Sequence, residues 1–262
     1  MKRKNSLLMP VPEPEEDFFI GWSKVPSADR RFLLAAVPAL AMVSGGLGWA
    51  IASQLDDPGA GSWQTSWTHT LTGELLRDPY PMIRSIDAQG NVMTTLLVAM
   101  GKCTSSLDIA MQAGGIHTAT GVLIERRGRH MLEVPFDVGE WLSPAPADFS
   151  VPDVTVETVS EDITLQGMIM DTKCFFGVMR PGRGKTHKAC ASLCIRGGIP
   201  PSFWAKTKEG REVVMLLTDE VGNPVSDQIL PLVAEAVEAR GKVVRQGGWL
   251  HFRVSPKDYR LL

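Results

Sequence analysis

Three cysteines and one histidine lie close together in the chain: Cys174, His187, Cys190 and Cys194. Thiolate sulfur and imidazole nitrogen complete the tetrahedral sites that Zn(II) prefers, and thiolates also select Cu(I). Met179 lies in the same stretch and would add a thioether ligand if copper is bound. The stretch therefore predicts one local copper or zinc site.

A short helix is expected to carry most of these residues. Thr186 can cap a helix over residues 187–196, because its hydroxyl can accept a hydrogen bond from a free amide of the first turn. Gly197 and Gly198, followed by Pro200, are typical of a helix end. We therefore expect one short helix between Thr186 and the glycine pair.

The predicted helix has His187, Cys190 and Cys194 at positions i, i+3 and i+7. Residues at this spacing share one face of an α-helix, so the three side chains should point the same way. Cys174 is expected at the end of the preceding strand, where its thiol can approach that face. The four side chains would then form one site.

Two other uses of the same thiols compete with a metal site. In an oxidising compartment two cysteines would form a disulfide, the third would be buried or paired with Cys103, and no cofactor would bind. His187 would then only begin the helix. Direct thiol redox chemistry is the third alternative, but the sequence has no Cys-x-x-Cys, which disfavours a thioredoxin-like enzyme, and no Cys-x-x-Cys-His for covalent haem.

Residues 32–52 form an apolar stretch without a charged side chain. At this length a helix covers the hydrocarbon core of a bilayer, which is about 30 Å thick. Basic residues precede the stretch, while Asp56 and Asp57 follow it, so the positive-inside rule places the tail of residues 1–31 in the cytoplasm. We predict a transmembrane anchor over residues 32–53, with the rest of the chain on the opposite side.

The residues around Arg30 and Arg31 resemble a twin-arginine export signal. Phe32 follows the arginine pair directly, whereas the usual pattern has one residue between. The resemblance implies a bacterial inner-membrane protein whose C-terminal domains lie in the periplasm. Ala50-Ile-Ala52 could be a cleavage site, but an uncleaved anchor is the preferred interpretation.

After the apolar stretch, short apolar runs interrupted by Gly, Pro and Asp favour β-structure over long helices. We predict a mainly β chain with two small OB-like barrel domains, at residues 60–145 and 161–262, joined by a linker over residues 146–160. Short helices complete the fold. One of these is predicted over residues 229–240, where apolar residues recur at helical spacing.

The two predicted domains share a pattern that suggests tandem duplication. Each begins with a strand that contains a glycine, Gly73 or Gly167, and each ends with a hairpin. The segment Asp-Pro-Tyr-Pro at residues 78–81 stands where the second domain has its cysteines. The first domain is therefore expected to serve in scaffolding or docking.

The order Cys174, His187-x-x-Cys190-Ala-x-x-Cys194 resembles a box of small bacterial periplasmic OB-like domains. The resemblance extends from about Asp162 to the C-terminus. It implies an OB-like barrel for this half of the chain and does not cover the first domain.

Composition and motifs narrow the function. The 27 Lys and Arg residues nearly balance the 29 Asp and Glu residues, so no strong positive field would attract nucleic acid. No Ser-His-Asp set, carboxylate pair or zincin helix is visible, so no catalytic residue is assigned and a non-catalytic protein is favoured over an enzyme. We predict an accessory subunit or assembly factor of an envelope redox complex with an integral-membrane partner. The alternative is a purely structural interaction subunit with a disulfide-locked loop.

Overall fold

The computed structural model describes residues 25–54, 61–66, 68–207, 209–225 and 227–262. The chain divides into two compact units, Met1–Asp57 and Pro58–Leu262. Most of the predicted cytoplasmic tail, up to residue 24, lies outside the described residues.

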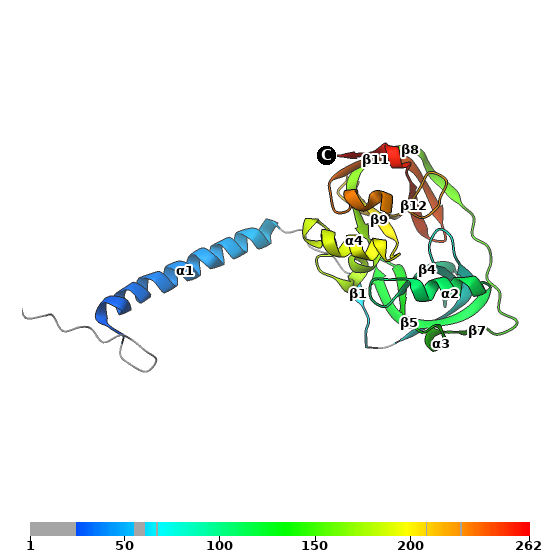
Figure 1. Ribbon diagram of the computed structural model, residues 1–262, viewed down its shortest axis with the longest axis horizontal. Coiled ribbons are helices and arrows are strands. Elements are labelled where there is room, and N and C mark those ends of the chain that lie inside the picture. The colour runs from blue at the N-terminus through cyan, green and yellow to red at the C-terminus, as the bar shows by residue number, and fades with distance from the viewer. Residues whose placement is uncertain (1–24, 55–60, 67, 208, 226) are drawn as a thin grey trace, which may run out of the picture. The chain divides into compact units, whose positions relative to one another are not determined.

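Helix α1 (Ser27–Gln54) is the described element of the first unit (Figure 1). It contains the predicted apolar stretch and extends it at its start, so that Arg30 and Arg31 lie within the helix. Its large apolar side chains are exposed, including Phe32 and Trp49. The segment Asp29–Gln54 is long and apolar enough to cross a membrane, a property that it shares with signal sequences.

The second unit contains two closed five-stranded barrels (Figure 1). The strands of the first barrel are β2 (His69–Leu76), β3 (Met82–Ile86), β4 (Val92–Ala99), β5 (Ile116–Arg126) and β6 (Arg129–Val134). They pair in the order β2-β3-β4-β6-β5, and β5 returns to β2 to close the barrel. Strands β1 (Gly61–Trp63) and β7 (Leu142–Pro144) pair with β5 outside this ring.

The second barrel repeats the same connectivity. Its strands are β8 (Glu157–Asp171), β9 (Pro201–Lys206), β10 (Glu212–Thr218), β11 (Val237–Gln246) and β12 (Trp249–Arg253), with β13 (Tyr259–Leu261) added on β11. The order is β8-β9-β10-β12-β11, closed by pairing of β11 with β8. The third and fifth strands are parallel in both barrels. This is the five-stranded Greek-key connectivity of an OB barrel, so the predicted fold is confirmed.

Matching glycines mark equivalent strands of the two barrels. A side chain at Gly73 of β2 or Gly167 of β8 would meet a backbone carbonyl of the neighbouring strand, from Arg84 or Trp204. Both positions therefore require a residue without a Cβ atom for close approach of the backbones. This shared detail supports the predicted duplication.

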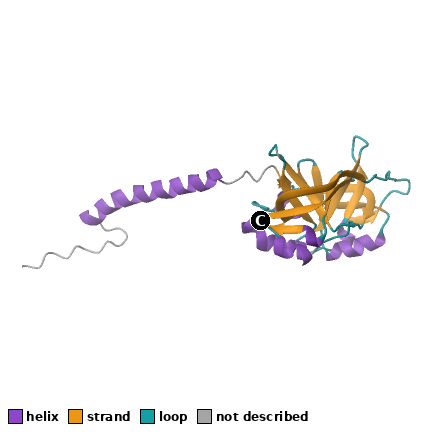
Figure 2. Ribbon diagram, turned by 90° about the horizontal axis from the view of Figure 1, so that it is seen from above, coloured by secondary structure: helices purple, strands orange, loops and turns teal. Residues whose placement is uncertain are grey.

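Short helices accompany the strands and gather on one side of them in Figure 2. They are α2 (Ser105–Ala113), α3 (Val138–Trp141), α4 (Lys188–Arg196), the π-helical turn η1 (Cys174–Val178) and the 3-10 turns η2 (Lys185–His187), η3 (Asp227–Leu232) and η4 (Pro256–Asp258). Helix α2 connects β4 to β5 in the first barrel, whereas the shorter η3 connects β10 to β11 in the second.

The predicted helix over residues 229–240 is wrong. Only its beginning is helical, as the 3-10 turn η3, and β11 starts at Val237. Pro231 lies inside η3, and a proline cannot donate the backbone hydrogen bond that an α-helix would need there. Val237 and Ala239 are buried by pairing with β8. Barrel closure therefore overrides the helical spacing of the apolar residues.

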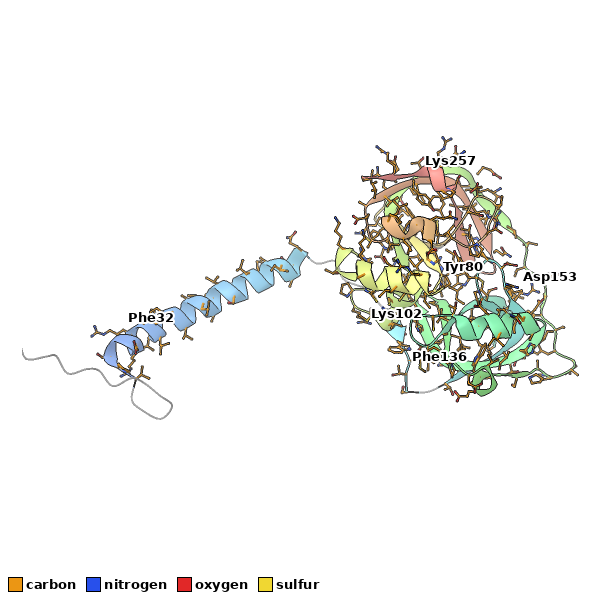
Figure 3. All side chains as sticks on the ribbon, viewed as in Figure 1. Phe32, Tyr80, Lys102, Phe136, Asp153 and Lys257 are labelled. Carbon is orange, nitrogen blue, oxygen red and sulfur yellow. The ribbon has the colours of Figure 1, made fainter. Side chains whose placement is uncertain are left out.

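The two barrels share a hydrophobic core. The cluster draws Leu96 and Ile124 from the first barrel and Phe176 and Trp249 from the second, among others. Polar contacts also cross the interface: the indole of Trp249 donates a hydrogen bond to the carbonyl of Thr94 at 2.8 Å. Tyr80, which is labelled in Figure 3, donates a hydrogen bond from its hydroxyl to the carbonyl of Leu217. The interface fixes the loops of one barrel against those of the other.

Candidate metal centre

The cysteines and the histidine lie in the loop between β8 and β9, residues 172–200. Strand β8 ends at Asp171, so Cys174 does not end the strand as predicted but begins η1. The amide of Met179 donates to the carbonyl of Cys174, which closes a π-helical turn. Such turns often occur at functional sites. The turn buries the Cys174 side chain.

Helix α4 presents the other ligands. It spans Lys188–Arg196, close to the prediction, but Thr186 does not cap it. The N-cap is His187, the last residue of the 3-10 turn η2, and it makes no side-chain capping bond. At the other end Gly198 has a φ of 99° and donates to the carbonyl of Ile195. A glycine is favoured in this left-handed conformation, which ends the helix.

The structure brings the predicted ligands together around Cys174. One group contains Cys174, His187 and Cys190, and a second contains Asp171, Cys174 and Cys194; within each group the ligand atoms lie within 4.8 Å of one another. Groups this compact could hold a metal ion. The side chain of Met179 is half-exposed and lines a cavity together with the three cysteines of these groups.

Asp171 is a member of the cluster that the sequence did not reveal. Its side chain is fully buried, and one oxygen accepts a hydrogen bond from the amide of Cys174 at 2.8 Å. The other oxygen lies 3.1 Å from Nε2 of His187. An ionised carboxylate can only accept, so Nε2 is the donor of this hydrogen bond, and in the neutral imidazole the lone pair is then on Nδ1. Carboxylates often orient metal-binding histidines in this way.

Lys102 of the first barrel, labelled in Figure 3, lies in the loop between β4 and α2 and approaches two of the sulfurs. Its ammonium nitrogen lies 2.7 Å from the sulfur of Cys190 and 3.8 Å from that of Cys194. The hydrogen bond to Cys190 raises the pKa of Lys102, which therefore stays charged. The positive charge of Lys102 is also one of the causes that lower the pKa of Cys194.

The hydrogen bond between Cys174 and Cys194 separates their pKa values. It lowers the pKa of Cys194 to about 7, although burial opposes this shift. The same hydrogen bond, together with burial, raises the pKa of Cys174. Cys194 therefore loses its proton at a lower pH than Cys174, and a metal bound to Cys174 would have to displace the proton of that thiol.

All four cysteines are free thiols. The sulfurs of Cys174 and Cys190 are 4.0 Å apart, about twice the length of a disulfide bond. The predicted alternative of a disulfide-locked loop is therefore not found, and neither is a bond from the cluster to Cys103. Three unbridged sulfurs remain available as ligands.

A cavity of about 390 Å³ opens beside the cluster. Cys174, Cys190 and Cys194 contribute to its lining, together with Lys102 and the buried pair of Lys173 and Glu133. The remaining lining residues are mainly apolar: Trp63, Met100, Gly101, Val178 and Met179. The thiols are therefore reached through an apolar entrance.

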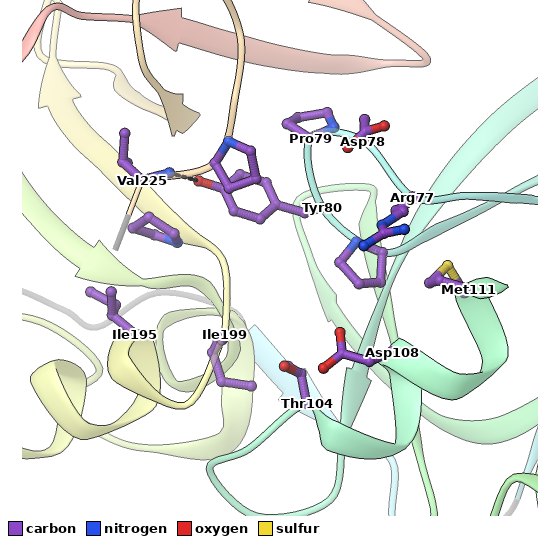
Figure 4. Close-up of a pocket in the computed structure, with 14 residues that line it drawn as sticks. Arg77, Asp78, Pro79, Tyr80, Thr104, Asp108, Met111, Ile195, Ile199 and Val225 are labelled. Carbon is purple, nitrogen blue, oxygen red and sulfur yellow. Dashed lines mark hydrogen bonds between the residues drawn. The ribbon is translucent and has the colours of Figure 1, made fainter. Parts of the chain in front are cut away.

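A second cavity, of about 300 Å³, lies where Tyr80 packs against the second barrel (Figure 4). The Tyr80 hydroxyl accepts a hydrogen bond from the amide of Val225 there. Arg77 and Asp108 are among the other lining residues, and none of the described residues that line this cavity is a cysteine or a histidine. The metal-binding side chains are gathered at the first cavity instead.

Sequence reasoning missed Asp171 and Lys102. Asp171 stands three positions before Cys174, and a carboxylate so close to a predicted metal-binding thiol is a signal that could have been used. Nothing in the sequence connects Lys102 with Cys190, because their contact depends on how the barrels pack.

No family model matches the chain, and no curated protein matches it either. The fold and the site define the class of protein. It has an N-terminal helix able to cross a membrane, two OB-type barrels in one unit and a Cys/His cluster that could hold a metal ion.

Proposed function

We propose that this protein is a membrane-tethered metal-binding protein of the bacterial envelope, with its barrels in the periplasm. It would serve as an accessory subunit or assembly factor of an envelope redox complex. The observation that carries the proposal is the gathering of three unbridged sulfurs and one imidazole at Cys174. This donor set suits Zn(II) or Cu(I).

Each side chain of the cluster has its own role in the proposed metal centre. Cys174, Cys190 and Cys194 supply thiolates, and His187 supplies a ring nitrogen. Asp171 lies within hydrogen-bond distance of Nε2 of His187, which leaves Nδ1 for the metal. Lys102 offsets part of the negative charge of the thiolates. An anchored α1 would keep the centre close to integral-membrane partners, which supports a role beside a membrane-bound redox complex.

Metal analysis of the full chain, purified in detergent from membranes, tests the metal centre. We expect about one zinc or copper ion per chain in the wild type and loss of the ion in C174S and C190S. C103S is the matched control, since Cys103 is a thiol of the same unit outside both ligand groups. A wild type without metal, or equal metal loss in C103S, would contradict the proposal.

Two cellular experiments test the proposed location of the barrels and the proposed role in a redox complex. Protease added to spheroplasts should digest the barrels, because they face the periplasm; a protected C-terminal half would refute the proposed topology.

Cells without the protein should lose activity of a membrane-bound redox complex. C103S should restore that activity and C190S should not. If both variants restore it, the protein supports the redox complex without its metal centre.

A further inference from the structure

The entrance of the cavity beside the thiols carries two exposed methionines. Met100 is 48% exposed and Met179 is 46% exposed, and both line the cavity together with Cys174, Cys190 and Cys194. The other methionines of the folded unit, all of them among the described residues, are buried or partly buried. Both exposed thioethers of this unit thus belong to one entrance.

The two methionines come from different barrels. Met100 follows β4 of the first barrel, and Met179 follows the π-helical turn of the second. Trp63, also from the first barrel, forms a further part of the wall, and its indole is held by a 2.9 Å hydrogen bond to Glu133. Packing of the barrels therefore creates this entrance, which neither barrel has alone.

A thioether sulfur is a suitable ligand for Cu(I) but not for Zn(II). Methionine is a soft ligand that binds Cu(I), whereas Zn(II) is bound by cysteine, histidine and carboxylate side chains. Nearly half of each of these methionine side chains remains in contact with water, so burial accounts for only part of its placement. Two such side chains beside three thiols are therefore better explained by copper than by packing.

We infer that Met100 and Met179 form a transfer site through which Cu(I) reaches Cys174, Cys190 and Cys194. The inference rests on the proposed metal centre and names its metal. The step is a ligand exchange without a change of oxidation state. Each bond from copper to a methionine sulfur breaks as a bond to a cysteine sulfur forms, and the proton of a neutral thiol leaves to water.

Rates of metal transfer test the inference. The full chain in detergent, reduced and freed of metal, would be mixed with the Cu(I) complex of bicinchoninate, and in parallel with Zn(II) bound to a chromophoric chelator. We expect M100L/M179L to take up Cu(I) at least about tenfold more slowly than the wild type, because the soft entry ligands are lost. Zn(II) uptake should stay within about twofold.

M93L is the matched control, since Met93 of β4 is a partly buried methionine that does not line the cavity. It should take up Cu(I) at the wild-type rate. Equal Cu(I) rates in the wild type and in M100L/M179L would overturn the inference, as would an equal slowing of Zn(II). A wild type that binds neither ion would instead refute the metal centre itself, so the two failures are distinguishable.

Discussion

Lys173 of the second barrel forms a buried ion pair with Glu133 of the first, with Nζ 2.6 Å from Oε1. Lys173 also donates to the carbonyls of Ala99 and Gly101, while the indole of Trp63 donates to the other oxygen of Glu133. Both charges are therefore buried with partners. The pair ties the loop that carries the cysteines to the first barrel.

Loss of one charge of this pair should destabilise the folded unit. K173M leaves the Glu133 carboxylate buried without its cation, and we expect the free energy of unfolding to fall by about 3–5 kcal/mol. Urea unfolding of the metal-free chain in detergent, followed by tryptophan fluorescence, measures the change. The double variant K173M/E133Q should lose less than the sum of the single variants, and additive losses would show that the pair is not coupled.

Asp171 should act on the metal through His187. D171N keeps the shape of the side chain but weakens the hydrogen bond that orients the imidazole, so we expect metal affinity to fall by about 10–100-fold. Competition with a chelator of known affinity measures this loss. D162N is the control, because Asp162 is an exposed carboxylate paired with Arg240. An unchanged affinity in D171N would exclude an orienting role.

Lys102 should raise the reactivity of Cys194. K102M removes a charge that lowers the pKa of Cys194, and we expect alkylation of this cysteine by iodoacetamide at pH 7 in the metal-free chain to slow by about three- to tenfold. Mass spectrometry of the modified peptides gives the rate for each cysteine. K102R should preserve most of the rate, and slowing in K257M, which removes an exposed charge elsewhere, would point to a nonspecific effect.

His251 should make the folded unit sensitive to mild acid. Burial in β12 lowers the pKa of His251 to about 4 from its usual 6.5. Between pH 6.5 and 4, His251 is therefore protonated in the unfolded chain but stays neutral in the folded chain. The folded state loses stability as the pH falls through this range. At about 1.4 kcal/mol per pKa unit, the loss is about 3 kcal/mol.

The variant H251F separates this contribution from that of the carboxylates. Both chains, freed of metal, would be unfolded by urea at several pH values. The free energy of unfolding of the wild type should decrease relative to H251F from pH 6.5 downward. Parallel curves for the two proteins would mean that His251 titrates normally in the folded chain.

Local patterns predicted much of the fold. The long uncharged stretch at residues 32–52 predicted a helix, and the structure has α1 there. Gly73 and Gly167 marked two strands whose backbones approach a neighbouring strand closely. The glycine pair at Gly197 and Gly198 likewise predicted where helix α4 ends. These features depend on residues that are near one another in sequence.

Other features depend on contacts between distant segments. Residues 237–240 belong to the stretch over residues 229–240 in which apolar residues recur at helical spacing. They nevertheless pair with β8, because the barrel must close. The approach of Lys102 to Cys190 follows from packing of the two barrels. Neither relationship leaves a local pattern, so one sequence alone could not reveal them.

The equivalent loops of the barrels differ in one respect that bears on evolution. Residues 77–81 connect β2 to β3, whereas residues 172–200 connect β8 to β9 and carry every thiol of the cluster. A lineage could therefore gain or lose the metal-binding capacity by lengthening or trimming a single connection. The strands that surround it, already present in duplicate, would not need to be redesigned.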